Sequence, residues 1–292
     1  MGYEAGAGGL WSRPALVFRQ QAGRVPSSPQ ARRPGGPVQA RRGHGAPAGR
    51  RAVVGRPCGK LGPMTAHLIT GAGSGIGAAV ARRLDERGDE LWLLARDAGR
   101  ARELERAFPG ARTLVGDLAA PEKLSWALSH QEVPERLDSI IHSAGVVELG
   151  TVGELTPKAW NRQLAVNLVS PAELTRLLLP QLRLSRGHVV FVNSGSGLRA
   201  NPDWSAYAAS KHGLKALADS LRAEEHDNGV RVTSVYPGRT ATPMQAKVHQ
   251  HEGKPYEQGR WIAAESVATT VVTALTLPRD AEVTDLSVRP GH

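Results

Sequence analysis

A tyrosine and a lysine four residues apart, Tyr207 and Lys211 in the run YAASK, are the pair best suited to proton transfer. They fall in a helical pattern, where a spacing of four places two side chains on one face. A free tyrosine, with a pKa of about 10, is a suitable acid but a poor base near neutrality. A nearby ammonium group stabilises the phenolate and lowers that pKa. Taken alone, the pair is better explained as an ordinary exposed tyrosine and lysine.

Other polar residues stand near this pair in the chain or at the ends of apolar runs. Ser194 comes thirteen residues before Tyr207, directly after the run GHVVFVN. Ser196 is a rival candidate, but the thirteen-residue offset favours Ser194. Asn167 lies in the middle of a long helical stretch, and the run HSAG at 142–145 follows another predicted strand.

A glycine cluster, LITGAGSGIG at 68–77, places four glycines within seven positions. A predicted strand ends at Thr70 and a helix begins near Ile76. Backbone N–H groups at the N-terminus of such a helix can bind a pyrophosphate. The spacing is not G-x-G-x-x-G, since Ile76 separates Gly75 from Gly77. A purely structural turn is an equally good explanation of this cluster alone.

Short apolar runs alternate with helical patterns from residue 64 onward. Apolar strands without polar alternation indicate burial on both faces, as in parallel sheets, and strand–helix alternation favours a doubly wound sheet. We therefore expect one α/β domain over 64–292, with helices on both faces of the sheet. Strands are predicted at 66–70, 90–95, 112–116, 138–142, 187–193, 230–236 and 283–288, and helices near 76–88, 98–108, 121–130, 157–184, 204–226 and 264–276.

Residues 1–63 form a leader of different composition. They hold ten Arg and one Lys against a single acidic residue, Glu4, so the whole formal charge of +10 lies there and residues 64–292 are neutral. Thirteen glycines and eight prolines also fall in it, which favours disorder. An organelle transit peptide and a nucleic-acid arm are weaker alternatives to a dispensable extension. The single cysteine, Cys58, excludes an intrachain disulfide, and no run is long enough to span a membrane.

The sequence from 64 to 292 resembles the classical, single-domain branch of the short-chain dehydrogenase/reductase family. The resemblance implies a Rossmann-like, mainly seven-stranded parallel sheet. It also implies an NADP(H)-dependent oxidoreductase that interconverts a secondary alcohol and a carbonyl on a small soluble substrate. A catalytically silent dinucleotide-binding sensor or scaffold is the alternative. The resemblance rests on TGAGSGIG at 70–77, Asp117 in GDL, HSAG, Asn167, Ser194, Tyr207-x-x-x-Lys211 and PGRTATP at 237–243.

The family pattern assigns roles to four catalytic residues. Tyr207 would give or take the proton, and Lys211 would also hold the nicotinamide ribose. Ser194 would orient the substrate oxygen, and Asn167 would hold a water that links Lys211 to solvent. The cofactor-binding residues implied by the resemblance are Thr70, Gly71, Gly73, Ser74, Gly75, Ile76, Gly77, Arg96, Asp117, Leu118, Ser143, Ala144, Gly145, Asn167, Tyr207, Lys211, Pro237, Gly238, Thr240 and Thr242.

The choice of cofactor depends on the end of the second strand, about 20 residues past the glycines, where an acidic residue selects NAD. The chain reads LWLLARD here, with Ala95 at the strand end and Arg96 next, 21 residues after Gly75. A guanidinium suits the extra phosphate of NADP in charge and geometry. Asp97 would favour NAD(H) if the strand ran further, but we expect it to face solvent or start the next helix. NADP(H) is therefore the predicted cofactor, with NAD(H) as the alternative.

Several histidines and aromatic residues have a plain packing explanation. Many family members carry Asn-Asn where this chain has His142 and Ser143, and we expect His142 to be packed at a strand end rather than catalytic. Residues 239–262 fall where the family carries a mobile substrate lid. His249 and His251 in it are weak evidence for a metal, so no metal is predicted. Met244, Tyr256 and Trp261 are candidate walls of the pocket, and loop packing explains them equally well.

The remaining expectations concern partners and location. Family members pair through the helices that correspond to 157–184 and 204–226, so we expect a homodimer or homotetramer. No nucleic-acid or membrane partner is predicted. The composition fits a cytoplasmic protein.

Overall fold

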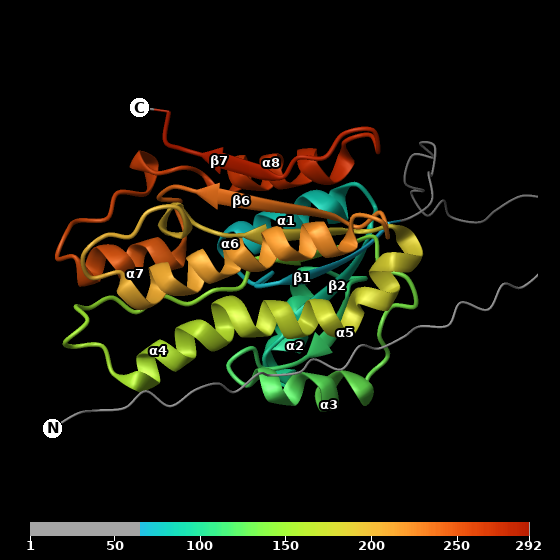
Figure 1. The fold of residues 1–292 in the computed structure, drawn as a ribbon, viewed down its shortest axis with the longest axis horizontal. Helices are drawn as coiled ribbons and strands as arrows, with labels where there is room; N and C mark the ends of the chain where they lie inside the picture. Colours follow the sequence, from blue (N-terminus) through green and yellow to red (C-terminus); the bar gives the residue numbers. More distant parts are fainter. Residues whose placement is uncertain (1–64, 292) are drawn as a thin grey trace, which may run out of the picture. The chain divides into compact units, whose positions relative to one another are not determined.

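Seven parallel strands form the centre of the computed structural model, which describes residues 65–291 (Figure 1). Their order is β3-β2-β1-β4-β5-β6-β7, so the chain reverses its direction of travel across the sheet between β1 and β4. Ligands of doubly wound sheets bind beyond the strand ends at such a reversal. The strands are β1 (Ala66–Thr70), β2 (Glu90–Ala95), β3 (Arg112–Val115), β4 (Ser139–His142), β5 (His188–Val192), β6 (Arg231–Pro237) and β7 (Asp285–Val288).

Helices cover both faces of this sheet, as the sequence predicted. Neighbouring strand residues point to opposite faces, so Ile69 joins the apolar core beneath α1, α2 and α8, while Leu68 joins the core beneath α3, α5 and α6. The helices are α1 (Gly75–Glu86), α2 (Ala98–Ala107), α3 (Leu124–Ser129), α4 (Pro157–Leu164), α5 (Ser170–Ser185), α6 (Ser205–Glu225), α7 (Pro243–His251) and α8 (Ala264–Thr276).

Two predicted segments differ from the structure in kind rather than by an end residue. The stretch predicted as one helix over 157–184 is α4, a π-helical turn at Ala165–Val169, and α5. The segment 239–262 contains a helix, α7, that no helical prediction covered. Thr242 begins it, with its side chain accepting a hydrogen bond from the Gln245 amide, and Pro243 occupies the first turn. The predicted leader, with Cys58, lies outside the described residues.

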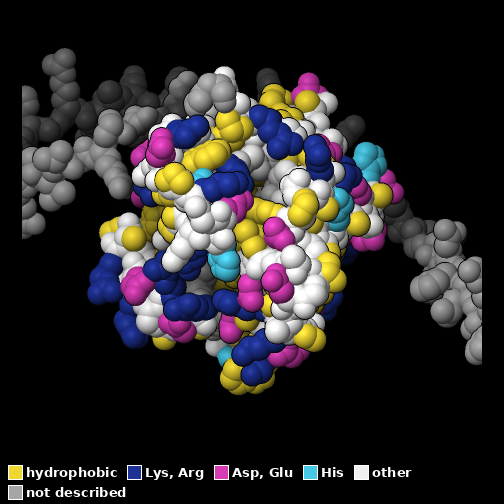
Figure 2. All heavy atoms as spheres, turned by 90° about the vertical axis from the view of Figure 1, so that its left-hand side faces the viewer, with side chains coloured by type: hydrophobic (Ala, Val, Ile, Leu, Met, Phe, Trp, Pro, Cys, Tyr) yellow, Lys and Arg dark blue, Asp and Glu magenta, His cyan; other side chains and the backbone are white. Residues whose placement is uncertain are grey.

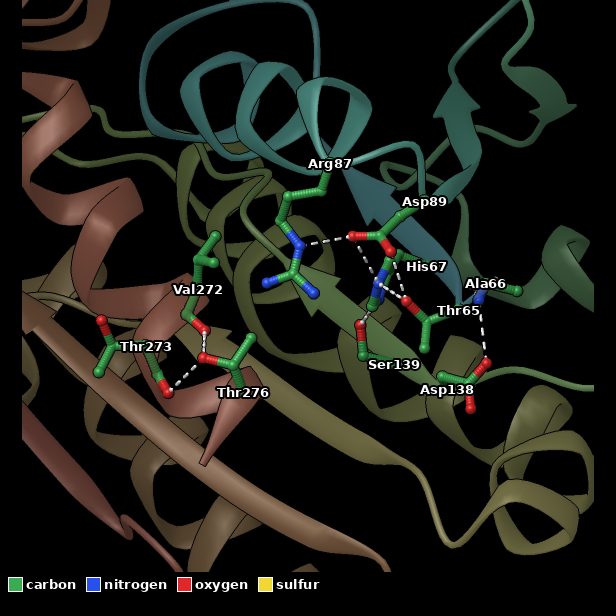
Figure 3. Close-up of polar contacts among 10 residues, drawn as sticks. All are labelled: Thr65, Ala66, His67, Arg87, Asp89, Asp138, Ser139, Val272, Thr273 and Thr276. Carbon is green, nitrogen blue, oxygen red and sulfur yellow. Dashed lines mark hydrogen bonds and ion pairs between the residues drawn. The ribbon is translucent and has the colours of Figure 1, made fainter. Parts of the chain in front are cut away.

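A polar cluster joins three strands at their N-terminal ends (Figure 3). The His67 ring on β1 is hydrogen-bonded to the hydroxyls of Ser139 on β4, at 2.7 Å, and of Thr65, at 3.0 Å. Thr65 in turn donates to Asp89, at 2.7 Å. Burial raises the pKa of Asp89, but hydrogen bonds from His67 and Thr65 outweigh it and leave the pKa below its usual value. These contacts stabilise β1 between its neighbours β2 and β4 at the N-terminal ends of the strands.

Candidate active site

A cavity of about 1120 Å³ opens at the C-terminal ends of the strands. Figure 2 shows the side of the molecule where β6 and β7 end, and on it a hollow bordered by basic and acidic side chains. A second cavity, of about 620 Å³, adjoins it and shares Gly71, Ser74, Arg96, Ala144 and Gly145. The other predicted residues in the walls are Ile76, Gly75, Ser143, Ser194, Tyr207, Lys211, Pro237, Gly238, Thr240 and Thr242 in the first cavity, and Gly73, Asp117 and Leu118 in the second.

The glycine loop lies against the loop that follows β4. Gly71 has a φ of +73°, and a Cβ there would stand 2.8 Å from the Ala144 nitrogen. A Cβ on Gly77 would stand 2.3 Å from the Gly71 oxygen. The Thr70 hydroxyl accepts hydrogen bonds from the amides of Ser143 and Ala144, both at 3.1 Å. Thr70 and Gly77 therefore hold the shape of the cavity from behind its wall.

The predicted catalytic pair points into the larger cavity from α6. The Nζ atom of Lys211 donates to the Val192 carbonyl at 3.1 Å, and it lies 5.9 Å from the centre of the Tyr207 ring. Both residues are buried. Burial lowers the pKa of Lys211 to about 8. Burial also raises the pKa of Tyr207, and a hydrogen bond with Ser194 only partly opposes the rise.

The expectation of a lowered pKa for Tyr207 is therefore wrong, because the net effect of its surroundings is to raise that pKa. The reason is that loss of hydration of the phenolate on burial is the largest effect on this group. Proton transfer at Tyr207 stays a prediction.

Ser194 lies close to Tyr207, at the end of β5. Its hydroxyl accepts a hydrogen bond from the Ser196 amide at 3.1 Å, which links the two rival serines. Asn193, which the sequence analysis did not single out, connects this strand end to α6. Its Nδ2 donates to the Lys211 carbonyl at 3.1 Å and its Oδ1 accepts from the Ser194 amide at 2.9 Å. The available signal for Asn193 in the sequence was a polar residue at the end of an otherwise apolar predicted strand.

Asn167 lies in the π-helical turn, behind the cavity wall. Its amide group donates to the Val146 carbonyl at 2.9 Å and to the Ser210 hydroxyl at 3.0 Å. Its Oδ1 accepts from the Val146 amide at 2.8 Å. The side chain therefore fixes the loop after β4 to α6. Its predicted role in holding a water stays a prediction.

The second cavity places two arginines beside the end of β2. Arg96 lines both cavities, and its side chain is 78% exposed. Asp97 starts α2 by accepting from the Arg100 amide at 2.8 Å, which confirms that it begins the next helix. It also accepts from the Arg96 Nε at 3.0 Å. The sequence analysis missed Arg100, whose guanidinium fills the space into which a side chain at Gly73 would project.

The segment after β6 supplies the remaining wall. Met244 and Gln245 on α7 line the larger cavity, whereas Tyr256 and Trp261 do not. Both of those rings instead contact the buried His249 ring, with centroids 5.4 and 5.1 Å away, so packing explains them. Over residues 65–291 no group of three or more His, Cys, Asp or Glu side chains is placed to hold a metal ion.

His142 is a packed histidine, as expected. Its ring stacks on Phe191, with 5.1 Å between the ring centroids, and is hydrogen-bonded to the Thr175 hydroxyl at 2.9 Å. Burial lowers its pKa to about 3. It lines neither cavity.

Comparisons with known proteins agree with this geometry. A family model described as short chain dehydrogenase matches residues 65–253. An uncharacterised oxidoreductase of Staphylococcus epidermidis is 28% identical over 229 residues, which are 76% of this chain and 96% of that protein. Dehydrogenase/reductase SDR family member 7B of Bos taurus is 33% identical over 65% of this chain and 62% of that protein. None of the helices described in the structure is long and apolar enough to cross a membrane.

Solved structures with bound nucleotides are also similar. An alcohol dehydrogenase of Thermococcus sibiricus complexed with 5-hydroxy-NADP is 26% identical, with a TM-score of 0.67, over 78% of this chain and 97% of that one. A metagenomic short-chain oxidoreductase in complex with NADP is 28% identical, with a TM-score of 0.65, over 78% and 98% of the two chains. The protein described here is thus an oxidoreductase with a nicotinamide dinucleotide site, and it belongs to the short-chain dehydrogenase family.

Proposed function

We propose that the protein interconverts a secondary alcohol and a carbonyl on a small substrate, with NADP(H) as its cofactor. One observation carries the proposal: Ser194, Tyr207 and Lys211 line one cavity that continues to the glycine loop. The cofactor, when bound, supplies or accepts the hydride. The walls fit a dinucleotide, because Ser74 and Gly75 line the cavity at the N-terminus of α1, where backbone N–H groups can bind a pyrophosphate.

The proton steps belong to the chain's own residues. The Ser194 hydroxyl orients the substrate oxygen, and the Tyr207 hydroxyl donates a proton to it during reduction. A raised tyrosine pKa keeps this proton in place near neutrality. In the oxidative direction the phenolate must form, and the positive charge of Lys211 stabilises it. A water held at Asn167 replaces the proton from solvent.

The charges beside β2 support the preference for NADP(H). The strand ends at Ala95, so no carboxylate stands at the position that selects NAD. Arg96 and Arg100 both line the second cavity, and Arg100 stands over Gly73. Together they place two guanidinium groups at this cavity, each with one carboxylate partner, Asp97 for Arg96 and Glu103 for Arg100, and with further N–H groups for a ribose phosphate. Asp97 is engaged as the N-cap of α2, where its carboxylate accepts from the Arg100 amide.

The decisive experiment measures the oxidation of NADPH across keto acids, keto esters, quinones, sugars and steroid ketones. We expect turnover on some of these compounds, and its loss in Tyr207→Phe. Protein that binds NADPH but reduces nothing in the panel would instead support the redox sensor or scaffold. A wild-type protein that prefers NADH would overturn the cofactor assignment.

We further propose that the protein assembles as a homodimer or homotetramer in the cytoplasm. Exposed apolar side chains along the predicted pairing segment support assembly: Val169, directly before α5, is 46% exposed, and Leu184, near the end of α5, is 74% exposed. Light scattering at working concentration tests the assembly, and a monomer would refute it.

A further inference from the structure

We propose that the substrate is an oxo acid or hydroxy acid whose carboxylate is bound by Arg289. The inference deepens the proposed function and rests on it. Arg289 directly follows β7 and lines the larger cavity together with Ser194 and Tyr207. The sequence analysis did not select it, because nothing in the local pattern connects it with Ser194, which lies on another strand.

The arginine reaches across the end of β6 toward the catalytic serine. A Cβ built on Gly195, the residue after Ser194, would stand 2.7 Å from a terminal nitrogen of the Arg289 guanidinium. The backbone at the base of this arginine is fixed, since the Gly238 amide donates to the Val288 carbonyl at 2.8 Å. Arg289 therefore places its charge beside the residue predicted to orient the substrate oxygen.

The charge of Arg289 is not matched by an acidic side chain. Within residues 65–291 no carboxylate lies within 4.0 Å of it, and its guanidinium donates no hydrogen bond there. Two other cations of this cavity are engaged: Arg239 forms two hydrogen bonds with Glu252, and Lys211 donates to Val192. Arg199, at the outer rim of the same cavity, is likewise without a carboxylate partner among the described residues. The cavity thus presents unmatched positive charge to a ligand.

A carboxylate is the group that fits this position. A guanidinium binds a carboxylate through two parallel hydrogen bonds, which fixes orientation as well as affinity. Because the guanidinium lies beside Ser194, the carboxylate must be only a few bonds from the carbonyl that Ser194 orients. This arrangement favours short oxo acids and their hydroxy acid products over neutral ketones.

A pair of substrates tests the assignment: 3-oxobutanoate carries a charged carboxylate, and its ethyl ester carries a neutral ethoxycarbonyl group at the same end. We expect wild-type protein to reduce the acid with a kcat/KM at least ten times that of the ester. Arg289→Gln should remove about a tenfold or larger part of kcat/KM for the acid, mainly through KM, and leave the ester within about twofold. Arg289→Lys, which keeps the charge, should recover part of the loss. Arg82→Gln, on the outer side of α1 and outside both cavities, is the charge-loss control.

A binding measurement avoids any dependence on turnover. Calorimetry with succinate, which cannot be reduced, should show binding to the NADPH-loaded wild type and to Arg82→Gln, and at least tenfold weaker binding to Arg289→Gln. Equal loss for the acid and the ester would assign Arg289 a structural role and overturn the inference. A phosphorylated ketone preferred over every acid would overturn the carboxylate. Failure to reduce any carbonyl, neutral or charged, would instead count against the proposed function.

Discussion

Lys211 lies one helical turn beyond Tyr207, with its Nζ atom 5.9 Å from the centre of the tyrosine ring. Both side chains are buried, and the ammonium group is hydrogen-bonded only to a main-chain carbonyl, that of Val192, among the described residues. Burial consequently disfavours the charged form of each group: it lowers the pKa of Lys211 to about 8 and raises the pKa of Tyr207. The fold therefore pays an electrostatic cost to bury either of these two groups in its charged form.

Replacing Tyr207 by phenylalanine should remove nearly all turnover and leave NADPH affinity within a few-fold of wild type. Only the oxygen that transfers the proton is lost, since the ring still fills its buried place. Steady-state kinetics and fluorescence titration of NADPH measure the two effects. Robust turnover in this variant would show that another group transfers the proton.

Replacing Lys211 by methionine should stabilise the cofactor-free protein near pH 7 while reducing both turnover and NADPH affinity. The pKa of Lys211 is about 8 in the folded protein, below the usual 10.5, so folding is penalised wherever the unfolded chain holds this proton. The penalty is complete below pH 8 and fades as the pH rises from 8 to 10.5. Urea unfolding at pH 7 and pH 10 should therefore show a gain in the variant that shrinks at the higher pH.

The exposed Lys158 on α4 provides the control, because Lys158→Met removes a charge without any burial to relieve. A gain in stability that is the same at both pH values for Lys211→Met would indicate better packing of methionine rather than relief of a buried charge.

Arg96→Ala and Arg100→Ala should each weaken NADPH binding by about tenfold to a hundredfold and leave NADH nearly unchanged. A charge-assisted hydrogen bond contributes about 1.5–3 kcal/mol, and the charged phosphate of NADP accepts one from arginine more strongly than the neutral ribose hydroxyl of NAD. Arg102→Ala, on an exposed face of α2, the helix that carries Arg100, is the matched control. Dissociation constants for both cofactors decide the matter, and equal losses for the two would mean that the arginines support the fold rather than the phosphate.

Acid should destabilise the protein partly through His142. Its pKa is about 3 in the folded protein, so between pH 6.5 and pH 3 the unfolded chain binds a proton that the folded chain refuses. Stability therefore falls as the pH falls through this window. His142→Gln, whose amide can still bond to Thr175, should show a flatter dependence of the unfolding free energy between pH 7 and pH 4. His251→Gln, on the exposed end of α7, should retain the wild-type dependence.

Local patterns predicted most of the fold and the centre of the site. Tyr207 and Lys211 share a helix face because of their spacing, and the strands were found because each is a short apolar run. The π-helical turn around Asn167 escaped prediction because the residues through 157–184 keep a helical pattern across it. Arg100 and Arg289 escaped for another reason: each acquires its place by meeting a glycine from a distant segment, Gly73 and Gly195 respectively. Such encounters depend on the folded arrangement rather than on spacing.

The π-helical turn at Ala165–Val169 also constrains the length of the chain. Each residue of an α-helix advances the direction of its side chains by about 100°, so deleting one residue here would turn α5 by that angle relative to α4. Leu174 and Leu182, which are fully buried in the core, would then leave it, or Asn167 would lose its contact with the Val146 loop. Substitutions on the outer face of this segment can be accommodated, but a gain or loss of a single residue cannot, so natural variation in length among related chains should be excluded from this stretch.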